Sequence, residues 1–286
     1  MKIGVLASGD LGLETLTKIV NEFKVNFVLT DKKSTDIISY CKLEFIPFFV
    51  GNPRGGNGYS FIKNIKVDII ASINYLFLIE KDIILHPRFL TFNIHGSLLP
   101  KYRGRAPHIW AIINNEKETG ITAHVIDEKC DSGDIISQIK IKIEEDFTGN
   151  DLLNKYKLEY FNLIKEVIDK VKNKNLRLVQ QDNTLATFFS KRTPDDGQIN
   201  WNWQIIRIKN WIRALSFPYP GAFTYLEEKK IIIDKVSEVS YSFCDKIENG
   251  TIIAVNPNII VKTPNGVLSL IKYRQEISVK VGDKFI

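Results

Sequence analysis

The chain has few cysteines and no long apolar run. Its three cysteines, at positions 41, 130 and 244, are an odd number, lie far apart and form no Cys-x-x-Cys pair. This pattern argues against a disulfide framework and against a thiolate metal site. No stretch approaches the roughly 18 uninterrupted apolar residues of a membrane span, and the apolar run at the N-terminus breaks at Ser8 and Gly9. We therefore expect a cytoplasmic protein with reduced thiols, no metal and no membrane partner.

A strong excess of one charge is also absent. The 286 residues include 39 Lys and Arg and 33 Asp and Glu, which gives a net charge of +6. The basic residues are scattered, and the densest group (Lys170, Lys172 and Lys174) lies in a polar stretch that is typical of a solvated face. The charge of +6 suggests an anionic partner without identifying it, and it fits a phosphate-bearing ligand.

Length and composition predict two domains. The chain is longer than a usual single domain, and its 44% hydrophobic and 11% aromatic residues suffice for a core. The patterns described below predict a catalytic domain at 1–180, a linker at 181–202 and a small C-terminal β domain at 203–286.

Strand and helix patterns alternate in the first part of the chain, which predicts a doubly wound, Rossmann-like α/β domain with a parallel sheet. The expected strands are 2–7, 25–29, 45–50, 67–73 and 91–95, and helical spacing appears at 11–23, near 61 and at 79–85. Further strands at 121–126 and 135–141 and a long amphipathic helix at 152–171 close this domain.

The pattern of predicted secondary structure changes after residue 203. One helical segment, 205–214, and a proline-rich elbow, SFPYPGAF, are followed by short alternating runs separated by turn residues. The expected strands are 223–225, 231–233, 250–255, 259–262 and 267–273. This spacing predicts a small barrel-like β domain.

The first strand-to-helix loop does not fit a dinucleotide site. The fingerprint Gly-x-Gly-x-x-Gly requires three glycines, and this loop has only Gly9 and Gly12. A tight turn explains both residues, and the loop can still line a cleft for a smaller ligand.

Residues 92–107, FNIHGSLLPKYRGRAP, hold most of the candidate catalytic and binding side chains. Side chains alternate along a strand, so Asn93 and His95 emerge on one face while Phe92 and Ile94 serve the other. An amide and an imidazole at a strand end can stabilise an oxyanion or exchange a proton, both of which suit acyl transfer.

A carboxylate is needed to orient the imidazole. Asp131 lies in a loop between two expected strands and can reach the same cleft, and Asp134 is the competing choice. The residues alone leave a structural explanation equally open, in which Asn93 and His95 satisfy backbone groups and Asp131 caps a turn.

These motifs resemble a known family. FNIHGSLLPKYRGRAP, followed by GITAHVIDEKCDSGDII, is similar to the catalytic motif of folate-dependent formyltransferases, and FFSKRTPDDGQINW and RALSFPYPGAFTY extend the similarity to the C-terminal part. The resemblance implies that 10-formyltetrahydrofolate donates the formyl group and that Asn93, His95 and Asp131 are catalytic. It further implies a folate site formed by Ser72, Asn74, Tyr75, Leu76, Phe77, Cys130 and Asp131.

The acceptor predicted from the resemblance is an amino sugar linked to a nucleoside diphosphate. Methionyl-tRNA formyltransferases carry a long basic insertion after the second strand, whereas the segment Thr30–Ser34 runs straight into the next helix here. The planar fork of Arg105 suits a diphosphate, with Lys191 and Arg192 behind it. A surface ion pair with Asp195 or Asp196 is the other explanation of the latter two. The expected substrate-binding residues are Gly9, Ser97, Arg103, Arg105, His108, Lys191, Arg192, Phe217 and Tyr219.

Several points stay open in the sequence. The aromatic residues above also suit a core, and His86 and His124 look structural. The first choice of acceptor is a thymidine diphosphate-linked 3-amino- or 4-amino-dideoxyhexose for lipopolysaccharide or capsule, used by a homodimer. A methionyl-tRNA formyltransferase and a non-catalytic folate- or nucleotide-binding module are the alternatives.

Overall fold

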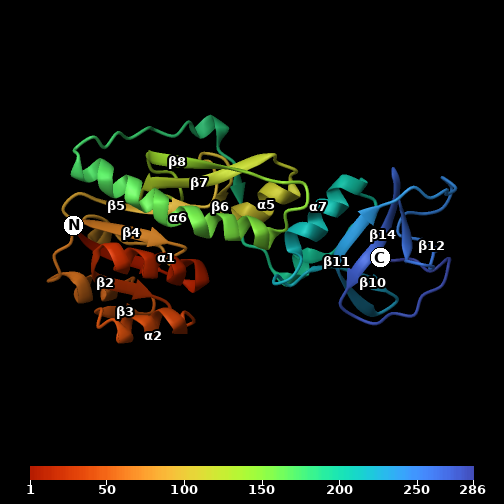
Figure 1. Ribbon diagram of the computed structural model, residues 1–286, viewed down its shortest axis with the longest axis horizontal. Helices are drawn as coiled ribbons and strands as arrows, with labels where there is room; N and C mark the ends of the chain where they lie inside the picture. Colours follow the sequence, from red (N-terminus) through yellow and green to blue (C-terminus); the bar gives the residue numbers. More distant parts are fainter. The chain divides into compact units, whose positions relative to one another are not determined.

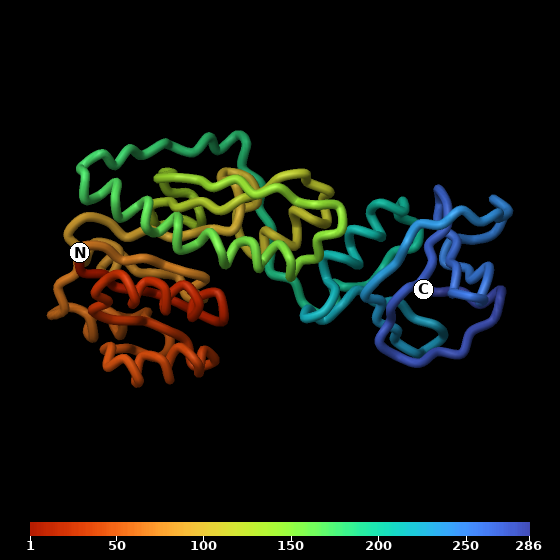
Figure 2. Tube along the Cα trace, viewed as in Figure 1, coloured from red at the N-terminus to blue at the C-terminus, as the bar shows by residue number.

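The computed structural model describes residues 1–286, which form two compact units (Figures 1 and 2). The first comprises Met1–Gly104, Thr119–Ile141 and Asn154–Phe189, and the second Arg105–Glu118, Lys142–Leu153 and Ser190–Ile286. The units interleave along the chain, and the first one extends into the expected linker. The domain limits at 180 and 203 stay a prediction.

The first unit contains a seven-stranded sheet, with strands in the order β3-β2-β1-β4-β5-β7-β8. The strands are β1 (Lys2–Ala7), β2 (Lys24–Thr30), β3 (Phe48–Val50), β4 (Ile69–Ile73), β5 (Leu90–His95), β7 (Glu118–Val125) and β8 (Ile135–Lys142). The helices are α1 (Gly9–Glu22), α2 (Thr35–Leu43), α3 (Asn57–Ile62), α4 (Lys81–Ile84) and α6 (Gly149–Lys172), of which the last begins in the second unit. The α/β fold predicted from the sequence is confirmed.

The sheet combines parallel and antiparallel strands. Strands β1 to β5 pair in parallel, whereas β7 is antiparallel to β5. The chain order also reverses next to β1, since β2 lies on one side and β4 on the other. In open α/β sheets ligands bind beyond the carboxyl ends of strands at such a reversal.

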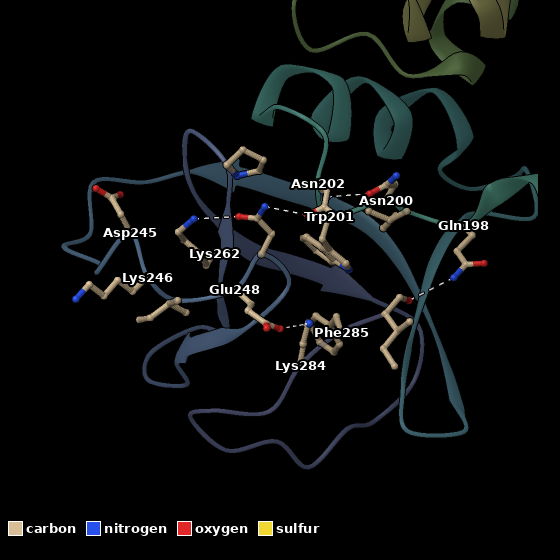
Figure 3. Close-up of a pocket in the computed structure, with 15 residues that line it drawn as sticks. Gln198, Asn200, Trp201, Asn202, Asp245, Lys246, Glu248, Lys262, Lys284 and Phe285 are labelled. Carbon is tan, nitrogen blue, oxygen red and sulfur yellow. Dashed lines mark hydrogen bonds and ion pairs between the residues drawn. The ribbon is translucent and has the colours of Figure 1, made fainter.

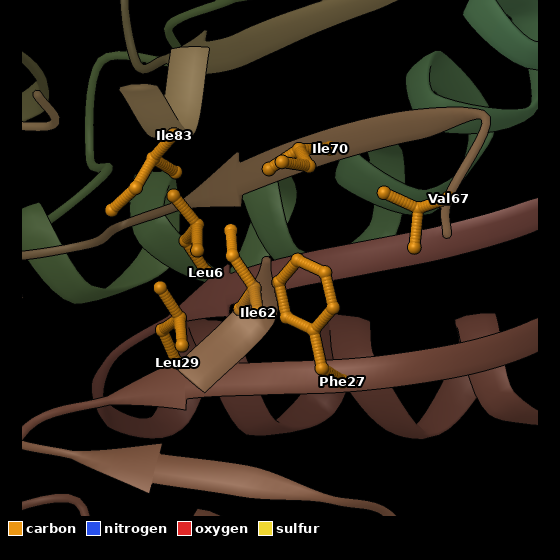
Figure 4. Packing of buried hydrophobic residues seen from close by; sticks show 7 residues of the cluster. All are labelled: Leu6, Phe27, Leu29, Ile62, Val67, Ile70 and Ile83. Atoms are coloured by element: carbon orange, nitrogen blue, oxygen red, sulfur yellow. The ribbon is translucent and has the colours of Figure 1, made fainter. Parts of the chain in front are cut away.

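An apolar cluster packs against β1, β2 and β4, and its side chains point toward one another in Figure 4. Its buried members are Leu6, Phe27, Leu29, Ile62, Val67, Ile70 and Ile83. Phe27 lies over Gly4, where an added Cβ would come within 2.3 Å of the ring. Because the strands are buried on both faces, they consist of nearly continuous apolar runs.

The second unit contains α5 (Pro107–Ile113), α7 (Ile205–Leu215) and a curled antiparallel sheet in the order β10-β11-β14-β13-β12. The strands are β10 (Ala222–Leu226), β11 (Lys229–Glu238), β12 (Ile252–Ala254), β13 (Ile260–Thr263) and β14 (Gly266–Tyr273). The expected barrel-like domain is thus a half-barrel with two edge strands. None of the helices in either unit is long and apolar enough to cross a membrane.

Candidate active site

The antiparallel pair of β5 and β7 gathers four polar side chains. Asn93 lies opposite His124 and His95 lies opposite Thr122, and paired residues point to the same side of a sheet. The alternate residues Phe92, Ile94 and Ala123 are buried apolar side chains. The local sequence therefore fixes the register, because a slip by one residue would exchange the apolar and polar faces.

Asn93 and His124 are directly joined. The Asn93 Nδ2 atom lies 3.2 Å from His124 Nε2, and His124 Nδ1 lies 2.9 Å from the Val125 carbonyl oxygen. A carbonyl only accepts, so His124 carries its proton on Nδ1 and accepts the Asn93 amide proton at Nε2. Burial lowers the pKa of His124 to about 4, against the opposing influence of Asp131. His124 is thus neutral, and the second Asn93 amide proton remains for a ligand.

His95 is held between a loop carbonyl and a carboxylate. Its Nε2 lies 2.7 Å from the Tyr102 carbonyl oxygen and therefore donates to it. Its Nδ1 lies 3.5 Å from Asp131 Oδ1, and the imidazole is nearly buried. When protonated, His95 can donate from both nitrogens, with Asp131 as the nearby counter-charge.

Asp131 is the carboxylate that completes the cluster. Its side chain is 11% exposed, and Oδ1 also lies 3.7 Å from His124 Nε2. Its Oδ2 accepts hydrogen bonds from the Gly104 amide, at 3.0 Å, and the Cys130 thiol, at 3.2 Å. Burial alone would raise the pKa of Asp131, but His95, the Gly104 amide, His124 and Cys130 together lower it below its ordinary value. Asp131, rather than Asp134, faces the imidazole.

Two residues that contact His95 have unusual backbone conformations. Tyr102 and Asp131 have φ of 60° and 53°, in the left-handed region that non-glycine residues rarely adopt. Such residues cost roughly 1–3 kcal/mol each and persist only where surrounding contacts impose them. Gly104 also has positive φ, and a Cβ there would lie 2.2 Å from the Phe189 carbonyl oxygen. The loops are therefore held in place rather than relaxed.

Known proteins are similar to this chain both in sequence and in fold. The family described as Formyl transferase matches residues 57–168, and Formyl transferase, C-terminal domain, matches residues 191–281. The chain belongs to the formyl transferase family. The resemblance inferred from the motifs is thereby confirmed.

Relatives of this formyl transferase include the bifunctional polymyxin resistance protein ArnA of Wigglesworthia glossinidia brevipalpis, which is 38% identical over 274 residues. The match covers 91% of this chain but only 41% of the relative's length.

Two solved structures share the fold. An N-formyltransferase from Helicobacter canadensis, in complex with folinic acid and dTDP-3-aminofucose, has 22% identity and a TM-score of 0.75 over 96% of this chain and 100% of that one. WlaRD, a sugar 3N-formyl transferase with dTDP and 5-N-formyl-THF, has 23% identity and a TM-score of 0.71 over 97% and 99%.

The segment after β4 of this formyl transferase holds most of the residues that were predicted to bind folate. Leu76 is 43% exposed, and Tyr75 and Phe77 pack edge to face beside it. Tyr75 packs against the apolar cluster of the first unit, its hydroxyl is buried without a hydrogen-bond partner, and burial, with the charge of Asp31, raises its pKa. Asn74 donates to the Ser8 carbonyl at 3.0 Å, and Ser72 is buried in β4 beside Asn93. Contact of these residues with folate stays a prediction.

Three predicted substrate-binding residues of the first unit make internal hydrogen bonds. The Gly9 amide donates to Ser34 Oγ at 2.9 Å, and Ser97 Oγ donates to the Lys101 carbonyl at 2.6 Å. The guanidinium of Arg103 is buried and bonded to side-chain oxygens. These residues shape the loops, and contact with the acceptor stays a prediction.

The remaining predicted substrate-binding residues lie in the second unit. Arg105 and Lys191 are exposed, as is Phe217, at 72%. His108 Nε2 lies 2.9 Å from the Tyr219 hydroxyl, and burial lowers the pKa of His108 to about 4. His108 therefore presents a neutral ring to Tyr219.

Arg192 packs inside the second unit. Its guanidinium carbon lies 4.9 Å from the centre of the Trp110 ring and 4.3 Å from a ring centre of Trp211, and it donates to the Asp196 carbonyl at 2.6 Å. The charge of Asp196 also acts on the Arg192 guanidinium, as the ion-pair explanation from the sequence expected. The diphosphate contact stays a prediction.

Replacement of Arg192 should reduce stability. Arg192→Ala removes two cation-π contacts and the apolar packing of the side chain, so we expect a loss of about 1–2 kcal/mol in the free energy of unfolding. Lys191→Ala, at the exposed neighbouring position, should change it by less than about 0.5 kcal/mol. Urea denaturation measures both, and equal values would contradict a packing role for Arg192.

A cavity of about 1170 Å³ opens in the second unit (Figure 3). Its polar side chains largely satisfy one another: Lys262 donates to Asn249, Asn249 donates to Asn202, and Lys284 pairs with Glu248. None of the predicted site residues lines it. We assign it no part in the reaction.

Sequence reasoning missed two residues of the site. His124 was placed in an apolar strand as a structural residue, but it contacts both Asn93 and Asp131. An antiparallel alignment of 121–126 with 91–95 would have revealed it. Gln181 was placed in a linker, but its side chain bonds the Asp131 loop. No local pattern marks that contact, which spans 50 residues.

Proposed function

We propose that the chain is an N-formyltransferase that moves the formyl group of 10-formyltetrahydrofolate to the amine of a nucleoside diphosphate-linked amino-dideoxy sugar. The observation that carries the proposal is the cluster of Asn93, His95 and Asp131 on the fold of the formyl transferase family. An amide donor, an imidazole and a low-pKa carboxylate on one strand face suit acyl transfer to an amine.

In this proposal 10-formyltetrahydrofolate supplies an electrophilic formyl carbon, which the neutral amine of the sugar attacks. The second Asn93 amide proton and the His95 imidazole stabilise the negative charge that develops on the formyl oxygen. Asp131 orients His95 or accepts the proton that leaves the amine, directly or through water. The bond between the formyl carbon and N10 of the donor then breaks, and N10 takes up a proton so that tetrahydrofolate leaves. The lowered pKa keeps Asp131 ionised, so the carboxylate has no proton of its own and can act as the acceptor.

The first choice of acceptor is a thymidine diphosphate-linked 3-amino- or 4-amino-dideoxyhexose. The two similar structures are complexes with dTDP or dTDP-3-aminofucose, which supports this choice. In the proposal Arg105 binds the diphosphate and the exposed Phe217 stacks on the base. We further propose a cytoplasmic homodimer that serves lipopolysaccharide or capsule assembly.

The methionyl-tRNA acceptor is the second candidate. Only the four residues Asp31–Ser34 connect β2 to α2, so the basic insertion that the resemblance associates with tRNA substrates is missing. Filter binding should show weak association with initiator tRNA. Tight binding that falls steeply with added salt would favour the tRNA acceptor instead.

A panel of acceptors tests the proposal. Uridine and thymidine diphosphate sugars with the amine at C3 or C4 are each incubated with 10-formyltetrahydrofolate, and the release of tetrahydrofolate is measured together with the mass of the sugar product. We expect one nucleotide and one amine position to dominate. No formylated product from any sugar would overturn the proposal, and an absence of all formyl-dependent turnover would indicate a non-catalytic binding module.

A further inference from the structure

We propose that Gln181 is a positioning residue that holds the Asp131 loop, and that Arg103 fixes the orientation of the Gln181 side-chain amide. The inference rests on the proposed function, because it takes Asp131 as the group that receives the proton. It assigns a task to a segment that the sequence presents as a linker.

Gln181 bonds the main chain on both sides of Ser132. Its Nε2 atom donates to the Asp131 carbonyl at 3.0 Å and to the Gly133 carbonyl at 2.7 Å. The residue is only 5% exposed, so water does not readily replace either bond. Both amide protons of Gln181 are used on the loop that carries the carboxylate.

Arg103 determines which way the Gln181 amide points. Its Nε and one terminal nitrogen donate to Gln181 Oε1 at 3.2 and 2.6 Å, and the same terminal nitrogen donates to Asn183 Oδ1 at 2.9 Å. A guanidinium only donates, so the Gln181 oxygen must face Arg103 and its nitrogen must face the loop. Arg103 is 3% exposed, and a charged donor in a buried place strengthens these bonds.

The Asp131 loop needs such an external support. Asp131 has φ of 53°, and Gly133 has no room for a side chain because a Cβ would lie 1.9 Å from the Val125 carbonyl oxygen. Gln181 holds the main chain, while the Gly104 amide holds Oδ2 of the carboxylate. Together they direct Oδ1 toward His95.

The same segment also reaches His95. Thr187 Oγ1 accepts from the Tyr102 amide, and the Thr187 carbonyl accepts from the Arg103 amide, both at 2.8 Å. The Tyr102 ring stacks on Phe189 at 5.0 Å, and its carbonyl accepts from His95. Residues 181–189 therefore support both the imidazole and the carboxylate.

Gln181→Ala and Gln181→Glu test the proposal, with Gln180→Ala at an exposed neighbouring position as the matched control. Gln181→Glu keeps the side-chain length and an acceptor for Arg103 but removes both donors to the loop. For each Gln181 variant we expect kcat to fall about 10-fold to 100-fold and both KM values to change less than about threefold. The control should match the unmodified enzyme. A kcat within about twofold of the unmodified enzyme in the folded Gln181 variants would overturn the proposal.

A double-mutant cycle separates positioning from a general loss of structure. If Gln181 acts through Asp131, Gln181→Ala should lower the residual kcat of Asp131→Ala by less than about twofold. An equal fold-loss in both backgrounds would assign Gln181 a role independent of Asp131 and contradict the inference.

The labelling rate of Cys130 reports on the conformation of the Asp131 loop, and its measurement does not require turnover. The exposed Cys130 thiol donates to Asp131 Oδ2, which opposes formation of the reactive thiolate. Gln181→Ala should raise the iodoacetamide labelling rate of Cys130 at least about threefold relative to exposed Cys244, measured by peptide mass spectrometry. An unchanged ratio would contradict the inference. If no sugar is formylated, the proposed function fails, whereas this labelling still decides whether Gln181 holds the loop.

Discussion

His95→Ala should lower kcat by on the order of 10²-fold or more while the protein stays folded. The change removes the ring that stands between the Tyr102 carbonyl and Asp131, together with its charge in the reaction. Asn93→Ala should cause a loss of similar size, because it removes an amide donor from the same strand face. Steady-state kinetics with the best acceptor of the panel measures both.

His95→Gln serves as the control for the loop. A glutamine amide can still donate to the Tyr102 carbonyl, but it cannot be protonated. We expect His95→Gln to lower the melting temperature less than His95→Ala does. The kcat of His95→Gln should still be low. Near-normal turnover in folded His95→Ala would refute the assignment of His95 as catalytic.

Asp131→Asn should lower kcat at least about 10²-fold. The substitution keeps the shape of the side chain and an oxygen for the Gly104 amide, but it removes the charge opposite His95. Asp134→Asn is the matched control, since Asp134 lies in the same loop and was the competing candidate from the sequence. A greater loss of kcat in Asp134→Asn than in Asp131→Asn would reverse the assignment.

The same variant changes the response of stability to acid. The folded-state pKa of Asp131 lies below the ordinary value of 3.8, so its contribution to stability is present above that value and is lost as the pH falls through the lowered pKa. Asp131→Asn should therefore flatten the decline of the unfolding free energy below about pH 4. Urea titrations at neutral and acidic pH measure this difference.

Much of the first unit follows from local sequence. The expected strand 2–7 coincides with β1, the expected strand 91–95 lies within β5 (Leu90–His95), and the helix expected at 11–23 corresponds to α1 (Gly9–Glu22). β1 is buried on both faces and is almost continuously apolar, β5 alternates apolar with polar residues, and α1 buries one face with helical spacing, so each pattern is easy to recognise. Direction of pairing carries no such local signal, and the antiparallel position of β7 could not be read from its residues.

The grouping of the candidate residues was partly predictable. Asn93 and His95 share a strand face by alternation alone, Asp131 and Asp134 were the carboxylates in reach of the same cleft, and the family resemblance favoured Asp131. The buried place of Arg103 could not be foreseen, because its partners Gln181 and Asn183 lie 78 and 80 residues away. A basic residue in a loop normally predicts solvent or a ligand, and here long-range hydrogen bonds override that expectation.

Residues 181–189 complete the support of the proposed catalytic residues late in synthesis. The sheet strands from β1 to β8 are complete by Lys142, but the segment that supports Tyr102 and Asp131 leaves the ribosome about 40 residues later. A nascent chain ending before Gln181 would carry Asn93, His95 and Asp131 without their support. The geometry of this cluster is therefore set only after the last strand of the first unit, β9 (Phe188–Phe189), has been made.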